Sequence, residues 1–278
     1  MRTVELADGT SVPALGQGTW MMGETGARHG EEVAALRLGL DLGMTLIDTA
    51  EIYGDGASEE LVGEAIEGRR DEVFLVSKLA PSHASRRGTI AACEASLERL
   101  GTDRLDLYLL HWRGRFPLGE TVAAMEDLID AGKILRWGVS NFDVADMEEL
   151  MEVEGARGCA VNQILYNLDH RGPEFDLLPW LDERIVAPMA YSPIGQGGAL
   201  LRRPALVEVA ERHDRSPAQI ALAFTLRHPG TLSIPKASTE AHVRDNAAAA
   251  DLRLDAEDWA LLDAAFPPPE RKTPLAMI

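Results

Sequence analysis

Short apolar stretches rich in β-branched residues recur along the chain, and longer stretches with apolar positions three or four residues apart separate them. The first kind is typical of strands buried on both faces, and the second of helices that bury one side. Alternating strands and helices predict a parallel sheet covered by helices, and eight such units predict an α/β fold closed into a (β/α)8 TIM barrel. The predicted barrel strands are 14–18, 45–49, 73–78, 105–111, 134–140, 160–165, 185–191 and 232–236.

The amphipathic stretches predict helices between these strands, and the connection 169–183 is the least regular one. Before the first strand, an Asp8-Gly9 turn joins the stretches 3–6 and 11–15, which predicts an N-terminal β-hairpin. No break in composition divides the chain, so one domain over 1–278 is expected, with a C-terminal tail that begins at the proline cluster 267–269. The predicted helices include 31–42, 58–67, 87–100, 120–131, 144–153, 204–213 and 240–250.

The main structural alternative is an open, doubly wound sheet. Such sheets usually carry a dinucleotide fingerprint of three glycines after the first strand. Here Gly16 and Gly18 are followed by Thr19, Trp20 and Met21, so the third glycine is missing. The absence of the fingerprint favours the barrel.

Composition and charge narrow the class of protein. The 278 residues are 46% hydrophobic and 26% charged, which matches the usual size of one α/β barrel. The formal net charge of −18 would repel nucleic-acid phosphates and anionic lipids, so neither nucleic acid nor a membrane is expected as a partner. An anionic ligand would need a local cluster of cationic groups or N–H donors.

Cysteine usage and the N-terminal residues indicate the compartment. Cys93 and Cys159 form neither a CxxC pair nor a metal-ligand spacing, so both are expected to be buried free thiols. Residues 1–10 contain acidic positions and no signal-peptide core, and no stretch reaches the ~20 apolar residues of a membrane span. We therefore expect a cytoplasmic protein.

Polar residues at the ends of predicted strands are the candidates for chemistry, because TIM barrels build their active sites there. Asp48, Lys78 and His111 end three successive strands, and Tyr53 follows Asp48 in the next loop. Tyr53 could donate a proton to a carbonyl oxygen if Lys78 lowered the pKa of its phenol below the ~10 of free tyrosine. Asp48 would keep Lys78 charged, and His111 would hydrogen-bond the same oxygen.

Each of these residues has a plain structural interpretation when taken alone. An aspartate after a strand is often a helix cap, a lysine at a strand end is usually solvated, and a His-Trp pair often closes a core. Chance seldom places mutually complementary groups on three successive strand ends, so the set favours a catalytic site.

The motifs along the chain, in this order, resemble those of the aldo-keto reductase superfamily. The resemblance runs nearly end to end and implies hydride transfer from NADPH to an aldehyde or ketone. It implies a tyrosine acid assisted by lysine, aspartate and histidine, which correspond to Tyr53, Lys78, Asp48 and His111. The motifs are LIDTAEIYG (46–54), SK (77–78), LLHW (109–112), GVSNF (138–142), VNQ (161–163) and IPK (234–236).

The resemblance also implies a binding site for NADPH. Ser140, Asn141 and Gln163 would hydrogen-bond the nicotinamide carboxamide, and Tyr191 would stack on the ring. The glycine-rich loop 192–198 would approach the pyrophosphate through its backbone, with Ser192, Ile194 and Gly195 as contacts.

The stretch 236–246 would bind the adenosine half of the cofactor. Lys236, Ser238 and Thr239 stand before a predicted helix and suit a 2′-phosphate, while Asp245 and Asn246 correspond to adenine contacts. His242 stands where many relatives carry an arginine that clamps this phosphate. NADPH is therefore expected over NADH, with the strictness of that preference left open.

Substrate contacts are expected from Trp20 and Trp112, with Met21, Phe116 and the tail as further candidates. Met21 could equally be ordinary core. Because the loop after His111 and the tail are short, we expect a pocket open at its rim that accepts small aldehydes, dicarbonyls or ketones. The family resemblance favours a monomer.

Two other functions remain open at this stage. The barrel could bind a nicotinamide nucleotide as a sensory or regulatory protein without significant turnover. It could also be a hydrolase or lyase in which Asp48, Glu51 and His111 hold a divalent ion, although Lys78 would compete with that ion. The complete set of four residues favours the reductase, for which no metal is expected.

Overall fold

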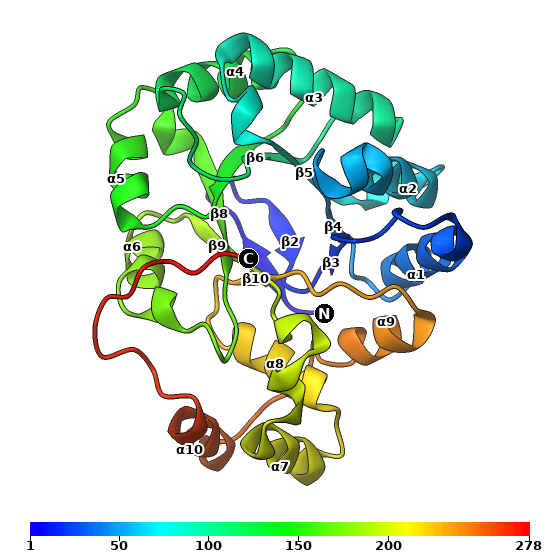
Figure 1. Ribbon diagram of the computed structural model, residues 1–278, viewed down its shortest axis with the longest axis vertical. Coiled ribbons are helices and arrows are strands. Elements are labelled where there is room, and N and C mark those ends of the chain that lie inside the picture. Colours follow the sequence, from blue (N-terminus) through cyan, green and yellow to red (C-terminus); the bar gives the residue numbers. More distant parts are fainter.

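The computed structural model describes residues 1–278 and contains a sheet of eight parallel strands inside a ring of helices (Figure 1). Each strand pairs with its neighbour in the chain. Parallel bridges from Leu15 to Ser233 and from Gly18 to Lys236 join the last strand to the first and close the barrel. The barrel strands are β3 (Gln17–Gly18), β4 (Leu46–Asp48), β5 (Phe74–Leu79), β6 (Leu107–Leu110), β7 (Trp137–Ser140), β8 (Cys159–Leu165), β9 (Ala187–Tyr191) and β10 (Leu232–Ser233).

The helices begin at clear local signals. Asp143, Ser216 and Asp255 each cap a helix in a reciprocal capping box, which satisfies backbone N–H groups that have no partner within the helix. The helices are α1 (His29–Asp41), α2 (Ala57–Ile66), α3 (Arg86–Leu100), α4 (Leu118–Asp130), α5 (Val144–Met151), α6 (Leu177–Glu183), α7 (Pro204–His213), α8 (Pro217–Thr225), α9 (Glu240–Ala247) and α10 (Ala256–Ala265).

The predicted fold is confirmed, and three of its helices, α6, α8 and α10, are not among the helical stretches that the sequence pattern identified. Helix α6 lies inside the connection 169–183, and α8 is buried at every position from Gln219 to Thr225. A helix that is buried all round has no polar side, so periodicity does not reveal it. The capping boxes of α8 and α10, Ser216 to Gln219 and Asp255 to Asp258, were the available signals.

An N-terminal hairpin of β1 (Thr3–Glu5) and β2 (Ser11–Pro13) covers one end of the barrel. Val4 and Val12 pack with the inward-facing barrel residues Leu46 and Phe74 in one apolar cluster. Because this hairpin fills the amino-terminal end of the barrel, the carboxyl ends of the strands are left for the site.

Side chains alternate between two apolar layers along each strand, as the pleat of a strand requires. Leu46 and Val76 point into the barrel, while Ile47 and Leu75 join the larger cluster between strands and helices. Both cysteines are free and buried, as predicted. None of the helices has the length and apolar character needed to cross a membrane.

Candidate active site

The four predicted catalytic residues meet at the carboxyl ends of β4, β5 and β6. Lys78 Nζ donates hydrogen bonds to Asp48 Oδ2 at 2.7 Å, the Thr49 carbonyl at 2.8 Å and Tyr53 Oη at 3.2 Å. Tyr53 opens a 3-10 turn, Tyr53–Gly56, in the connection between β4 and α2. The rings of Tyr53 and His111 lie edge to face with centroids 5.8 Å apart.

Lys78 and Asp48 form an ion pair in the protein interior, with 0% and 3% of their side-chain surfaces exposed. Burial by itself lowers the pKa of Lys78, but Asp48 and Tyr53 together outweigh burial and raise it. Burial raises the pKa of Asp48 against the opposing pull of Lys78 and Gln163. The proton stays on the amine, so Lys78 presents an ammonium to the phenol.

The acidity of Tyr53 differs from the prediction. Burial raises the pKa of Tyr53 above its ordinary value of 10.0, and Lys78 opposes this without reversing it. The sequence revealed the cation but not the loss of solvent around the phenol. In the protein alone, Tyr53 therefore carries its proton at neutral pH, which is the state that a proton donor needs.

His111 is neutral in this site. Burial, with a smaller effect of the nearby Lys78 charge, lowers the pKa of His111 to about 2. Its Nδ1 atom is buried and has no hydrogen-bond partner, whereas the ring lines the cleft described below. Because an orphaned N–H is costlier than an orphaned acceptor, we place the proton on Nε2, the nitrogen that reaches the cleft.

These protonation states predict the pH profile of a reaction that uses Tyr53 as an acid. We expect kcat/KM for carbonyl reduction to be flat between about pH 5 and 9, because His111 stays neutral and Tyr53 stays protonated. The value should fall at higher pH, as the phenol loses its proton. A steady-state pH series checks this, and a bell-shaped profile centred near pH 6 to 7, about the ordinary pKa of histidine, would contradict it.

We call Asp48, Tyr53, Lys78 and His111 the tetrad. A cleft of about 1030 Å³ runs from the tetrad to the start of α9. Trp20 and Trp112 stand at the end beside Tyr53 and His111, and they are 41% and 37% exposed. The volume lies at the upper end for ligand pockets and suits a long ligand with a small molecule beside it. The predicted residues that line it are Trp20, Met21, Asp48, Tyr53, His111, Trp112, Ser140, Asn141, Gln163, Tyr191, Ser192, Ile194, Lys236, Ser238, Thr239, His242, Asp245 and Asn246.

Three predicted residues lie outside the cleft wall. Lys78 is buried beneath it and reaches it only through Tyr53 and Asp48. Gly195, at φ +58, turns the loop, and its neighbours Ile194 and Gln196 form the wall. Phe116 packs against the core between strands and helices, so its assignment to the substrate wall is wrong.

The residues expected around the nicotinamide form hydrogen bonds with one another. Ser140 Oγ donates to the Gln163 carbonyl at 2.9 Å, and Tyr191 Oη donates to Asn141 Oδ1 at 2.8 Å. Gln163 Nε2 donates to Asp48 Oδ1 at 2.7 Å, which leaves the amide oxygen of Gln163 free to accept from a ligand. The same contact links this part of the wall to the ion pair of Lys78 and Asp48.

Several non-glycine residues beside the cleft have left-handed backbone conformations. Asn141 has φ 59, Ser192 φ 47 and Gln196 φ 58, a region that most side chains avoid. The Asn141 conformation is fixed by its backbone N–H on the Gln163 carbonyl at 2.8 Å and by its amide on the His111 carbonyl at 3.1 Å. Strained backbone that surrounding contacts hold in place often marks a functional site.

The far end of the cleft carries hydroxyl and cationic groups at the start of α9. Thr239 caps this helix by accepting from the His242 backbone N–H at 3.3 Å. Lys236 has no ion-pair or hydrogen-bond partner on its side chain. Asp245 Oδ2 accepts from Ser216 at 2.6 Å. Arg28, which belongs to none of the sequence motifs, also lines this end of the cleft.

The proposed metal site is contradicted by the position of Glu51. Its Oε1 atom accepts from the Ala80 backbone N–H at 2.5 Å and pairs with His83 Nδ1 at 2.9 Å. Glu51 therefore does not join Asp48 and His111. No three His, Cys, Asp or Glu side chains form a group that could hold a metal ion.

The C-terminal tail returns across the barrel mouth, as the last part of the chain shows in Figure 1. Lys272 Nζ bridges Asp143 at 3.3 Å and Asp176 at 3.1 Å, and Met277 and Ile278 line the cleft. The rim is therefore more covered than the short tail suggested.

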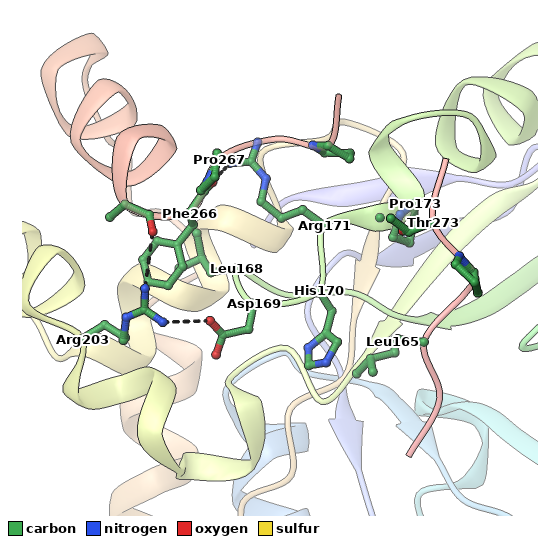
Figure 2. Close-up of a pocket in the computed structure, with 15 residues that line it drawn as sticks. Leu165, Leu168, Asp169, His170, Arg171, Pro173, Arg203, Phe266, Pro267 and Thr273 are labelled. Carbon is green, nitrogen blue, oxygen red and sulfur yellow. Dashed lines mark hydrogen bonds and ion pairs between the residues drawn. The ribbon is translucent and has the colours of Figure 1, made fainter. Parts of the chain in front are cut away.

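A second cavity of about 410 Å³ lies behind the tail. Figure 2 shows its wall, in which Arg203 pairs with Asp169 at 3.4 Å and Thr273 of the tail lies beside Pro173. Thr273 and Ala276 line this cavity, and Met277 and Ile278 line the long cleft. The tail thus forms a wall shared by the two.

The barrel, the tetrad and the cleft together define a class of protein, and the chain belongs to the Aldo/keto reductase family, whose model matches residues 14–266. The chain is 52% identical to a methylglyoxal reductase of Escherichia coli, covering 100% of this chain and 99% of the relative. It is 37% identical to a glyoxal reductase of Bacillus subtilis, covering 94% and 92% of the two chains. An aldo/keto reductase of Klebsiella pneumoniae, solved in complex with NADP and acetate, has a TM-score of 0.98 at 51% identity, covering 100% of this chain and 99% of that chain.

Proposed function

We propose that this protein is an NADPH-dependent reductase of small 2-oxoaldehydes. The observation that carries the proposal is the contact of a buried ammonium, Lys78, with the phenol of Tyr53 at the wall of a long cleft. Its relatives named methylglyoxal reductase and glyoxal reductase indicate the substrate class. Two solved structures of Klebsiella pneumoniae aldo-keto reductases, each 51% identical to this chain, contain NADP and NADPH, which supports the cofactor.

The residues along the cleft suit NADPH by their chemistry. The free amide oxygen of Gln163 suits the carboxamide N–H groups, and the ring of Tyr191 offers a flat face for stacking. At the other end, the unpaired ammonium of Lys236 and the hydroxyl of Ser238 suit a phosphate. When bound there, NADPH supplies the hydride that reduces the carbonyl carbon.

Side chains of the protein then stabilise the negative charge that develops on the carbonyl oxygen. Tyr53 donates its phenolic proton to this oxygen, and the Lys78 ammonium stabilises the phenolate that forms. Asp48 holds Lys78 and keeps it charged. His111 donates from Nε2 to the same oxygen and orients the substrate.

The substrate end of the cleft suits a small neutral carbonyl compound. Trp20, Ile52 and Trp112 provide apolar walls beside Tyr53 and His111. No arginine or lysine side chain other than Lys78, which is engaged by Asp48, stands among these groups. An uncharged dicarbonyl therefore fits better than a carboxylate substrate.

The direct test is oxidation of NADPH, followed by its absorbance, with methylglyoxal and glyoxal as substrates. We expect turnover with both, slower turnover with simple ketones, and activity that survives a metal chelator. NADH in parallel measures the cofactor preference. Binding of NADPH without turnover of any carbonyl compound would instead support the regulatory alternative.

Removal of Met277 and Ile278 is expected to raise KM for methylglyoxal by about threefold to tenfold, because two apolar side chains leave the rim. The value of kcat should change little, since neither residue takes part in the hydrogen bonds that Lys78 makes to Asp48 and Tyr53. Lys272→Ala, which releases the tail from Asp143 and Asp176, should change KM in the same direction. Steady-state kinetics check both variants, and an unchanged KM would contradict the role of the tail.

We further infer one domain, a monomer and a cytoplasmic location. The match of the family model to residues 14–266 supports one domain, and membership of the family favours a monomer. The free, buried thiols of Cys93 and Cys159 suit the reducing cytoplasm. Light scattering on the purified protein measures the oligomeric state, with the mass of one chain, 30.2 kDa, as the expected result.

A further inference from the structure

Arg28 lies in the cleft although it is far in sequence from the other residues of its adenosine end. It ends a 3-10 turn, Gly26–Arg28, in the connection between β3 and α1. Its Nη2 atom donates to Ser238 Oγ at 2.8 Å, across 210 positions of the chain. This contact places a guanidinium among Lys236, Ser238 and His242.

The guanidinium has donors left for a ligand. Nε contacts Glu31 at 3.4 Å, and Nη1 has no hydrogen-bond partner. The side chain is 45% exposed, so it is neither buried in the core nor saturated by carboxylates. A guanidinium in this state can donate two parallel hydrogen bonds to a phosphate.

The adenosine end of the cleft needs such a cation. An adenosine 2′-phosphate carries up to two negative charges, and the protein as a whole has a net charge of −18. Lys236 supplies one positive charge, and position 242 carries an imidazole, which lacks the planar fork of donors that a guanidinium offers a phosphate. An arginine from the connection between β3 and α1 would supply the second positive charge.

We propose that Arg28 is a cofactor-specificity residue that binds the adenosine 2′-phosphate and replaces, from the segment before α1, the arginine missing at position 242. The inference rests on the proposed function, because it assumes that the adenosine half of NADPH lies at this end of the cleft. It predicts that the chain prefers NADPH over NADH although it has a histidine at position 242.

Calorimetric titration of the full-length protein with 2′,5′-ADP and 5′-AMP tests the assignment without any turnover. For Arg28→Gln we expect about 10-fold or greater weakening of 2′,5′-ADP binding and less than about twofold change for 5′-AMP. NADPH and NADH should follow the same division. Arg87→Gln is the matched control, since Arg87 is exposed on α3 and outside the cleft, and it should bind both nucleotides as the wild type does.

A second variant separates charge from local structure. In the Arg28→Gln background, His242→Arg should recover most of the lost 2′,5′-ADP affinity, because a guanidinium returns to the same end of the cleft. Lys236→Ala should weaken 2′,5′-ADP selectively, as Arg28→Gln does. Thermal melting of each variant checks that the fold is intact.

Two results would overturn the assignment in distinguishable ways. If wild-type protein binds 2′,5′-ADP more tightly than 5′-AMP and Arg28→Gln leaves that difference unchanged, or weakens both nucleotides equally, Arg28 does not contact the phosphate. If wild-type protein binds neither nucleotide, the proposed function itself fails, and the role of Arg28 fails with it.

Discussion

Tyr53→Phe is expected to lower kcat for methylglyoxal reduction by about 100- to 10,000-fold, the usual contribution of a positioned proton donor. The substitution removes the phenolic proton and keeps the ring that packs edge to face with His111. Lys78 retains its hydrogen bonds to Asp48 and the Thr49 carbonyl, so the ion pair stays in place. NADPH affinity, measured by calorimetry, should change by less than about threefold.

A matched tyrosine provides the control for Tyr53→Phe. Tyr108 is buried in β6 within the layer between strands and helices, and it does not line the cleft. Tyr108→Phe removes the same hydroxyl group elsewhere in the barrel and should leave kcat within about twofold. Equal activity of Tyr53→Phe and wild type would remove Tyr53 from the mechanism.

Lys78→Met is expected to lower the free energy of unfolding by about 3–5 kcal/mol, because it leaves the carboxylate of Asp48 buried without its cation. Activity should be lost as well, since nothing then stabilises the Tyr53 phenolate. Equilibrium unfolding in urea measures the stability, and NADPH oxidation with methylglyoxal measures the activity.

A double variant distinguishes the two effects of this substitution. Asp48→Asn combined with Lys78→Met removes both charges, so most of the lost stability should return. Activity should not return, because the phenol still lacks an ammonium. A single Lys78→Met variant as stable as the wild type would show that Asp48 is not a buried charge in need of a partner.

The tetrad could be predicted from the sequence because each member has a fixed place relative to a strand. Asp48, Lys78 and His111 end three successive strands, and parallel strands bring their carboxyl ends to one rim. That relation depends only on chain order and strand direction. It does not depend on details of packing.

Helix α8 and the acidity of Tyr53 could not be predicted in the same way. The residues of α8 from Gln219 to Thr225 are all buried because neighbouring elements cover every side of the helix, and the sequence pattern by itself does not show this. The pKa of Tyr53 depends on how much solvent surrounds the phenol, which is set by the folded cleft. In both cases burial, a property of the tertiary structure, decides the outcome.

Local patterns along the chain were enough to predict the barrel, the order of its strands and the polar side chains at its carboxyl rim, because strand and helix periods and strand-end positions depend on nearby residues. The tertiary structure was needed to show which distant residues share the cleft. It brought Arg28 to Ser238 and laid Met277 and Ile278 over the mouth of the barrel. Contacts between residues far apart in the chain depend on how loops pack over the strand ends, and no local pattern encodes that packing.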